Sequence, residues 1–230
     1  MAFAADMPDF DDLLESAAAV QEIVPDAVRV GGTAAAVHAG HRLSMNHDHV
    51  VADLRDRFEI VLNALEREGE WVTNRVPAGN IVLGELGGIE SGVRQLIRSR
   101  PLEVEQRLLR SGRTLTVPTF DETLRVKAFL IVERNQVRDY LDVAALSDKA
   151  GVEHAARVLV GIDDYYADQV HDDGPVASQV ARQLADPRPK DAALTTRLAT
   201  YKGLDPRWWQ WSAVTDVCRD VARAMMEEEV

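Results

Sequence analysis

The chain has 230 residues, with 26 Lys and Arg against 38 Asp and Glu, and a formal net charge of −12. This acidity disfavours a protein that wraps a nucleic-acid backbone non-specifically, because such proteins are basic. Apolar residues make up 46% of the sequence, which is typical of a globular protein, and no apolar run approaches the ~18 residues of a transmembrane helix.

The start of the chain and its cysteine content predict the compartment. Residues 1–6 lack the basic residues that begin a signal peptide. Cys218 is the single cysteine, so an intrachain disulfide is excluded and a reducing environment is favoured. We therefore expect a cytoplasmic protein that does not associate with membranes, with Cys218 as a buried structural thiol.

The first half of the chain alternates amphipathic segments with short apolar runs. Apolar residues recur on one face of residues 9–23, as in a helix that packs on a core. Further helices are expected at 33–39 and 55–68. Strands are expected at 27–30, 48–52, 71–75, 81–86, 102–105 and 114–117.

After residue 118 the pattern becomes helical. The expected helical segments are 119–147, 152–168, 178–185, 191–200 and 206–229, with Pro175, Pro187 and Pro189 in the breaks. The sequence thus predicts an α+β protein. Residues 1–118 form a mixed sheet flanked by helices, and residues 119–230 form a helical bundle that contributes to the same cleft.

The stretch from residue 31 to residue 49 carries the clearest chemical pattern. It opens with the turn Gly31, Gly32 and Thr33 before a short helix. Backbone N–H groups at such a turn contact phosphates without obstruction by side chains. Ser44, Asn46 and Asp48 follow at alternate positions, so they share one face if the strand extends back that far, and His47 and His49 share the other face. The oxygen atoms of the first three are suitable Mg²⁺ ligands, and the combination predicts a site for a nucleotide's phosphates and a divalent metal.

This stretch resembles the first motif of the AbiEii-type nucleotidyl transferases, the toxins of type IV toxin–antitoxin systems, which include the mycobacterial MenT toxins. The matching positions are Gly31-Gly32-Thr33-Ala34, Gly40-His41-Arg42, Ser44, Asn46, Asp48, His49 and Val50. The resemblance implies a polymerase-β-like nucleotidyltransferase fold with an added helical domain. It also implies Mg²⁺-dependent transfer of a nucleotide from an NTP to a macromolecular acceptor, most simply a tRNA 3′ end, and an antitoxin protein as partner.

A second match lies in the helical half. Residues 122–129, Arg134 and residues 138–142 resemble later motifs of that family. The resemblance implies that Lys127 binds triphosphate oxygens and that Asp142 acts as an acid or base or positions Lys127. Arg42, Ser44 and Arg134 would contact phosphate. The alternative is a surface helix with ordinary salt bridges.

Asn46 is the main departure from the family pattern, which has Asp at this position. An amide oxygen can still bind a metal ion but contributes no negative charge. Three interpretations stay open: an enzyme whose carboxylates are Asp48, Glu90 and Asp142; a protein that binds a nucleotide without transferring it; or a detoxified enzyme. Glu90 is either a third metal ligand on a central strand or a loop glutamate beside two glycines.

Other features have more ordinary interpretations. The arginines between residues 94 and 113 contact RNA phosphate or are solvated and paired with Glu103 and Glu105. Trp208 and Trp211 are expected to seal the helical core. The overall acidity also leaves open a cationic small molecule as the acceptor.

Overall fold

The computed structural model describes residues 10–75, 79–169 and 173–228. Asp9, the first residue of the predicted helix 9–23, residues 1–6, for which no signal peptide is predicted, and Glu229 lie outside the described residues. Contacts divide the chain into two compact units. Unit 1 comprises the described parts of Met1–Thr33, Ser44–Ile97 and Leu102–Pro118, and unit 2 comprises Ala34–Leu43, Arg98–Pro101 and the described parts of Thr119–Val230.

Unit 1 is built on a five-stranded mixed sheet with the order β1-β2-β5-β4-β3. Its strands are β1 (Val28–Val30), β2 (His47–Val51), β3 (Trp71–Arg75), β4 (Ile81–Leu86) and β5 (Ile89–Gln95). Only β2 and β5 run parallel among these neighbours, with Asp48 opposite Gly92, and the other pairs are antiparallel. The central position of β5 brings residues more than forty positions apart in sequence onto adjacent strands.

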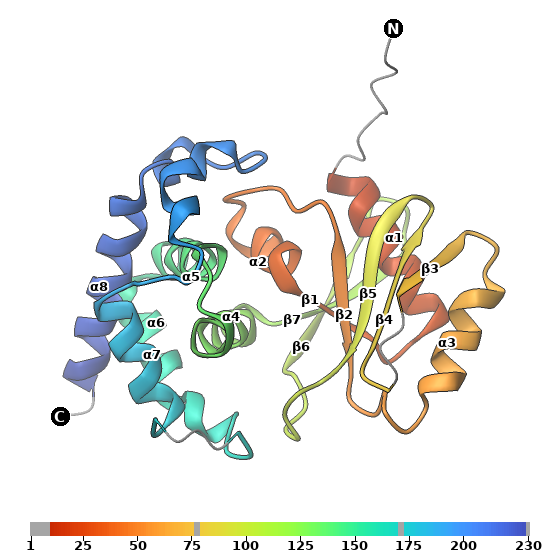
Figure 1. Cartoon of the computed structure of the whole chain (residues 1–230), viewed down its shortest axis with the longest axis horizontal. Coiled ribbons are helices and arrows are strands. Elements are labelled where there is room, and N and C mark those ends of the chain that lie inside the picture. The colour runs from red at the N-terminus through yellow and green to blue at the C-terminus, as the bar shows by residue number, and fades with distance from the viewer. Residues whose placement is uncertain (1–9, 76–78, 170–172, 229–230) are drawn as a thin grey trace, which may run out of the picture. The chain divides into compact units, whose positions relative to one another are not determined.

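Helices α1 (Phe10–Ile23) and α3 (Phe58–Arg67) cover one face of this sheet (Figure 1). Val20 of α1 and Leu65 of α3 share a buried apolar cluster with Val82 and Val93 of the strands. Because side chains alternate between faces along a strand, the neighbours of these apolar residues point to the opposite face. Asp48, Leu83 and Arg94 belong to that opposite face.

A two-stranded antiparallel ribbon completes unit 1. It is formed by β6 (Val104–Leu108) and β7 (Thr114–Pro118). Leu115 and Val117 of β7 pack with Ala17 and Ala18 of α1 in a second apolar cluster. The ribbon is thereby held to unit 1 through β7.

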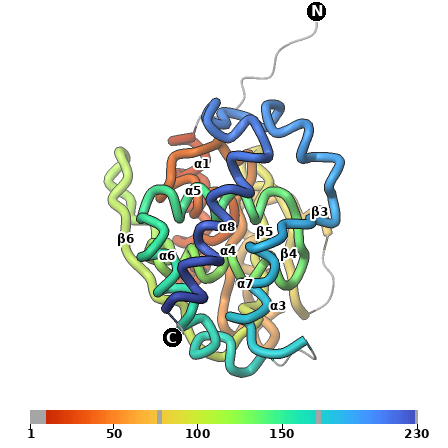
Figure 2. The backbone as a smooth tube through the Cα atoms, turned by 90° about the vertical axis from the view of Figure 1, so that its left-hand side faces the viewer, coloured from red at the N-terminus to blue at the C-terminus, as the bar shows by residue number. Residues whose placement is uncertain are grey.

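Unit 2 is helical. Its elements are most of α2 (Gly31–Ala39), α4 (Phe120–Arg134), α5 (Val137–Ala150), α6 (Val152–Val160), η1 (Gly161–Asp164), α7 (Val176–Ala185), η2 (Ala192–Thr200), η3 (Pro206–Trp208) and α8 (Trp211–Glu228). The N-cap of α4 is Thr119, whose hydroxyl accepts a hydrogen bond from the Glu122 backbone N–H. Figure 2 shows α8 running alongside α6 and α7. Cys218 is buried in this core, as predicted.

The structure confirms the α+β class and a mixed sheet flanked by helices. The strands expected at 71–75 and 81–86 have those bounds, whereas β6 begins two residues later than expected. No strand was expected over the whole of β5, and only Glu90 within it was considered as part of a central strand. The helix expected at 191–200 is the 3-10 helix η2 (Ala192–Thr200), and the helix expected at 206–229 is divided into η3 and α8. Across the part of the chain that the structure describes, no helix combines the length and apolarity that a membrane crossing requires.

Candidate functional site

Asp48 lies on β2 above a glycine of the neighbouring strand. A Cβ atom added to Gly92 would lie 2.8 Å from Asp48 Oδ1 and 3.0 Å from Leu83 Cδ2. Real Cβ atoms do not approach other atoms so closely, so the absence of a side chain at Gly92 leaves the space that the carboxylate occupies. On its other side, Asp48 Oδ2 would be 3.6 Å from a Cβ on Gly31. Gly31 has φ of 82°, a backbone conformation that favours glycine.

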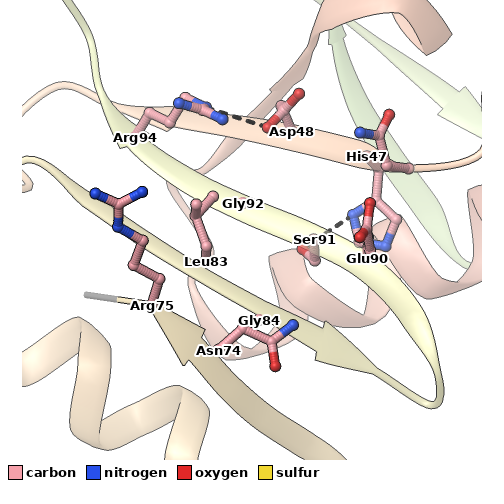
Figure 3. Close-up of a pocket in the computed structure, with 11 residues that line it drawn as sticks. His47, Asp48, Asn74, Arg75, Leu83, Gly84, Glu90, Ser91, Gly92 and Arg94 are labelled. Atoms are coloured by element: carbon pink, nitrogen blue, oxygen red, sulfur yellow. Dashed lines mark hydrogen bonds and ion pairs between the residues drawn. The ribbon is translucent and has the colours of Figure 1, made fainter. Parts of the chain in front are cut away.

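These residues form one end of a pocket of about 280 Å³ on the face of the sheet opposite α1 and α3. Figure 3 shows side chains from β2, β3, β4 and β5 around it. Its lining residues are Asn46, His47, Asp48, Asn74, Arg75, Leu83, Gly84, Glu90, Ser91, Gly92 and Arg94. All of them belong to unit 1. The volume suits a small ligand or one part of a nucleotide.

The carboxylate of Asp48 is paired with a guanidinium. Arg94 Nε donates to Asp48 Oδ1 at 3.1 Å, and the two side chains are 45% and 30% exposed (Figure 3). Arg29 is completely buried, and its guanidinium has no hydrogen-bond partner among the described residues. Burial lowers the pKa of Arg29 to about 9, while the charge of Asp48 opposes this shift. Arg29 therefore stays cationic at neutral pH.

Two histidines lie on the buried side of β2. His47 connects the sheet to its surroundings through Ser16 Oγ at 3.0 Å and Ser91 Oγ at 3.2 Å. Burial, with a smaller effect of the Arg29 charge, lowers the pKa of His47 to about 3. His49 is fully buried, and burial together with His47 and Arg29 lowers its pKa well below the ordinary value. Both rings are neutral at pH 7, and the prediction that they share the face opposite Asp48 is confirmed.

The loop before β2 holds the two other predicted oxygen ligands. Strand β2 begins at His47, so Ser44 and Asn46 precede it. Ser44 Oγ donates to the Asn46 backbone oxygen at 3.1 Å, and Thr33 Oγ1 donates to the same oxygen at 3.0 Å. Asn46 is exposed and lines the pocket. Gly32 lies between Gly31 and Thr33 in the first turn of α2.

The predicted metal ligands Asp48, Asn46 and Glu90 include only two carboxylates. Across residues 10–75, 79–169 and 173–228, no group of three or more His, Cys, Asp or Glu side chains is placed to hold a metal ion. Glu90 does lie on the central strand β5, and it lines the same pocket as Asp48. However, Asp48 is already paired with Arg94 and Asn46 is neutral. The side chains at Asp48 therefore offer a divalent ion no complete set of protein ligands, so such an ion would depend on phosphate oxygens for the rest of its coordination.

The remaining predicted site residues belong to unit 2, where Asp142 is the centre of a buried ionic cluster. Its carboxylate accepts hydrogen bonds from His41 Nε2 at 2.8 Å and from Arg42 Nε at 2.8 Å and Nη2 at 3.0 Å. Lys127 Nζ lies 2.7 Å from Asp142 Oδ2, the oxygen that also accepts from Arg42 Nη2. The side chains of Lys127 and Asp142 are 1% and 0% exposed.

The charges of this cluster compensate for its burial. Burial alone raises the pKa of Asp142, but Arg42, Lys127 and His41 outweigh it and hold that pKa well below the ordinary value. Burial lowers the pKa of Lys127, and Asp142 opposes the shift. Lys127 and Asp142 thus contact each other, as the positioning role predicted for Asp142 requires. The predicted contacts of Lys127 and Arg42 with phosphate stay predictions.

Arg134 and the arginines near residue 98 have partners in unit 2. Arg134 donates to both oxygens of Asp139, at 2.7 and 2.5 Å. Arg98 is 3% exposed and donates to Glu122 Oε1 at 2.5 Å. The expectation that Arg98 is a solvated or RNA-facing residue is wrong, because its guanidinium is needed to neutralise a buried carboxylate.

Sequence comparison finds similarity to segments of much longer proteins. The chain is 32% identical over 258 aligned residues to the heme uptake protein MmpL11 of Mycobacterium tuberculosis, which covers 98% of this chain and 24% of that protein. It is 32% identical over 180 residues to the mycolic acid-containing lipids exporter MmpL11 of Mycolicibacterium smegmatis, with 78% of this chain and 16% of that protein covered. The chain spans about a quarter of the length of the first of these relatives, and no family model matches it.

The matches to solved structures are distant. The antibiotic-resistance factor ANT(2'')-Ia matches with a TM-score of 0.46 and 12% identity over 69% of this chain and 93% of its own. An antigenic nucleotidyltransferase-like protein from Paracoccidioides brasiliensis matches with a TM-score of 0.47 and 13% identity over 70% of this chain and 88% of its own. At these values the likenesses establish neither a shared family nor a shared activity.

Sequence reasoning missed three residues of the site. Gly92 provides the space for Asp48, Arg94 pairs with it, and Arg29 adds a buried charge near it. Arg94 was noticed only as part of a run of arginines. The signal that could have identified Gly92 is a glycine within a run of otherwise strand-compatible residues, which often marks a close approach to another group.

Proposed function

We propose that this chain is a nucleotidyltransferase-like protein whose unit 1 binds the phosphates of a nucleoside triphosphate in the pocket beside Asp48. The observation that carries the proposal is the convergence of the Gly31 turn, Asp48 and Gly92 at one end of that pocket. Two cationic side chains, Arg75 and Arg94, belong to the lining, and guanidinium groups are well suited to phosphate oxygens. The motif from residue 31 to residue 49 supports the same assignment.

Transfer of a nucleotide is the second candidate. The resemblance to the AbiEii-type toxins favours Mg²⁺-dependent transfer to a tRNA 3′ end, opposed by an antitoxin, with Lys127 on the triphosphate and Asp142 near the acceptor. The neutral Asn46 and the pairing of Asp48 with Arg94 favour binding without transfer. A cationic small acceptor is disfavoured at this pocket, because Arg75 and Arg94 would repel it.

Binding and transfer are separated by one set of proteins. The natural chain, Asp48→Ala and Asn46→Asp are each incubated with Mg²⁺, one α-labelled NTP at a time, and total tRNA. Label on tRNA with the natural chain, lost in Asp48→Ala, would establish transfer. Label only with Asn46→Asp would identify a nucleotide-binding protein silenced at that position.

Two further measurements complete the test. Equilibrium dialysis with each labelled NTP measures binding directly, and absence of binding by the natural chain would contradict the proposed function. Expression of the natural chain and of Asp48→Ala in a bacterial host tests the toxin role, because growth arrest that Asp48→Ala relieves is expected only of an active toxin.

A further inference from the structure

The carboxylates around the pocket are more than neutralised by the protein's own arginines. The lining contains two carboxylates, Asp48 and Glu90, and two guanidiniums, Arg75 and Arg94. Arg29 adds a third cation, because it is completely buried near Asp48 and stays protonated at neutral pH. The group as a whole therefore has one positive charge in excess, without any metal ion.

Arg94 occupies one of the two carboxylate oxygens through which Asp48 could contact a metal ion. Its Nε lies 3.1 Å from Asp48 Oδ1, while Oδ2 is directed towards Gly31. A divalent ion that approached this carboxylate would be repelled by Arg94 at its side and by Arg29 behind it. The neutral side chain of Asn46 supplies no charge to offset that repulsion.

A phosphate group would be attracted by the same two arginines, because it is an anion. Arg94 is 45% exposed, so one edge of its guanidinium can be reached from the pocket. Its bond to Asp48 is a half-exposed ion pair, of a kind that contributes little stability and can be exchanged. A phosphate that enters the pocket can take the place of Asp48 on Arg94, since phosphate and carboxylate oxygens match the same guanidinium geometry.

We infer that the guanidinium of Arg94 takes the place of a divalent metal at this site, so that unit 1 binds the phosphates of its nucleotide without a metal ion. This inference rests on the proposed function and specifies how the phosphate is held. It assigns Arg94 as the phosphate ligand, Arg29 as a buried charge that favours the anion, and Asp48 as the group that the phosphate displaces.

The test measures binding of labelled ATP and GTP to the full chain by equilibrium dialysis, in excess EDTA and in excess Mg²⁺. The affinity in EDTA is expected to equal or exceed that in Mg²⁺, since Mg²⁺ neutralises part of the phosphate charge. Arg94→Gln should weaken binding about tenfold, as for the loss of one charged hydrogen-bond donor. Arg113→Gln is the matched control, because Arg113 also pairs with a carboxylate in unit 1, at 3.2 Å, and is 43% exposed.

Asp48→Asn gives results of opposite sign under the two mechanisms. If Asp48 competes with phosphate for Arg94, its neutralisation tightens nucleotide binding severalfold. If Asp48 holds a metal ion, the same change weakens or abolishes binding. Circular dichroism of each variant establishes that unit 1 keeps its fold.

Each outcome has a distinct meaning. Binding in EDTA that Arg94→Gln weakens and Asp48→Asn strengthens supports the inference. Binding that requires Mg²⁺ and is lost in Asp48→Asn overturns it and leaves the proposed function intact. No binding of any NTP under either condition overturns both.

Discussion

The strongest stability prediction concerns the buried carboxylate of Asp142. Asp142→Asn keeps the size of the side chain but removes the charge that offsets Arg42 and Lys127, and Lys127 is 1% exposed. Removal of one partner from a buried ion pair leaves an uncompensated charge and costs about 3–5 kcal/mol. Since domains have a total stability of about 5–15 kcal/mol, unit 2 should lose a large part of its free energy of unfolding.

Tryptophan fluorescence during urea unfolding measures this effect in the relevant unit. Trp208, Trp209 and Trp211 lie in unit 2, and a Trp71→Phe background removes the tryptophan of unit 1. Asp148→Asn is the control, because its ion pair with Arg207 is 32% and 56% exposed and should contribute less than about 1 kcal/mol. A loss below about 1 kcal/mol for Asp142→Asn would refute the argument.

The loss of stability in Asp142→Asn should depend on pH through the pKa of Asp142. The folded-state pKa of Asp142 is depressed well below 3.8, so its contribution is present above the unfolded-state pKa and is lost as the pH falls through the folded value. The difference between the natural chain and Asp142→Asn should therefore be constant near neutral pH. It should shrink only below about pH 4.

Three further changes test the remaining assignments. Lys127→Met should destabilise the chain less than Asp142→Asn in the same urea experiment, because it removes a buried charge while His41 and Arg42 still donate hydrogen bonds to Asp142. An equal or larger loss would contradict this order. The pKa of His47 is lowered to about 3, so its contribution to the free energy of unfolding is present above pH 6.5 and should decline by up to about 1.4 kcal/mol per pH unit as the pH falls from there. In His47→Gln, the urea midpoints should depend less on acid pH. An unchanged dependence would exclude this histidine as its source. Gly92→Ala should cost about 1–3 kcal/mol of stability through overpacking and weaken ATP binding in dialysis. Gly69→Ala should do neither, because a Cβ at Gly69 would have no atom within 4 Å. Equal effects of the two changes would refute the close approach of Asp48 to Gly92.

Much of the fold could be predicted because its elements have clear local patterns. Apolar residues at helical spacing located α1, α3 and most of unit 2, and alternation placed His47 and His49 on the face opposite Asp48. Strand β5 was missed because Gly92, together with Gly87 and Gly88 just before the strand, gives this segment the composition of a loop. What makes it a strand is pairing on both sides, with β2 and β4, which a local pattern does not contain.

The site was predictable only where its residues are neighbours in sequence. The Gly31 turn and Asp48 form one motif, and the structure brings them together. The partners that set their charge come from distant segments: Arg94 is 46 residues from Asp48, and Arg42 is 100 residues from Asp142. Such pairs depend on strand order and helix packing, so composition and spacing give no access to them.

Asn46 and Arg94 both reduce the negative charge that a metal ion would meet at the site. A neutral residue at 46 removes a negative charge, and Arg94 neutralises the charge of Asp48. If both features keep metal ions away, Asn46→Asp alone leaves Arg94 in place and should create at most weak metal binding. Only Asn46→Asp combined with Arg94→Gln presents two carboxylate groups without the adjacent cation.

Binding of Mn²⁺ alone, followed by the loss of its free electron paramagnetic resonance signal, measures this directly. The double variant should bind Mn²⁺ at least about tenfold more tightly than Asn46→Asp, since one repelling charge is removed at close range. Arg113→Gln in place of Arg94→Gln controls for the change in net charge. Equal Mn²⁺ affinity of Asn46→Asp with and without Arg94→Gln would mean that the missing carboxylate alone determines metal binding, and that Arg94 has no part in excluding the ion.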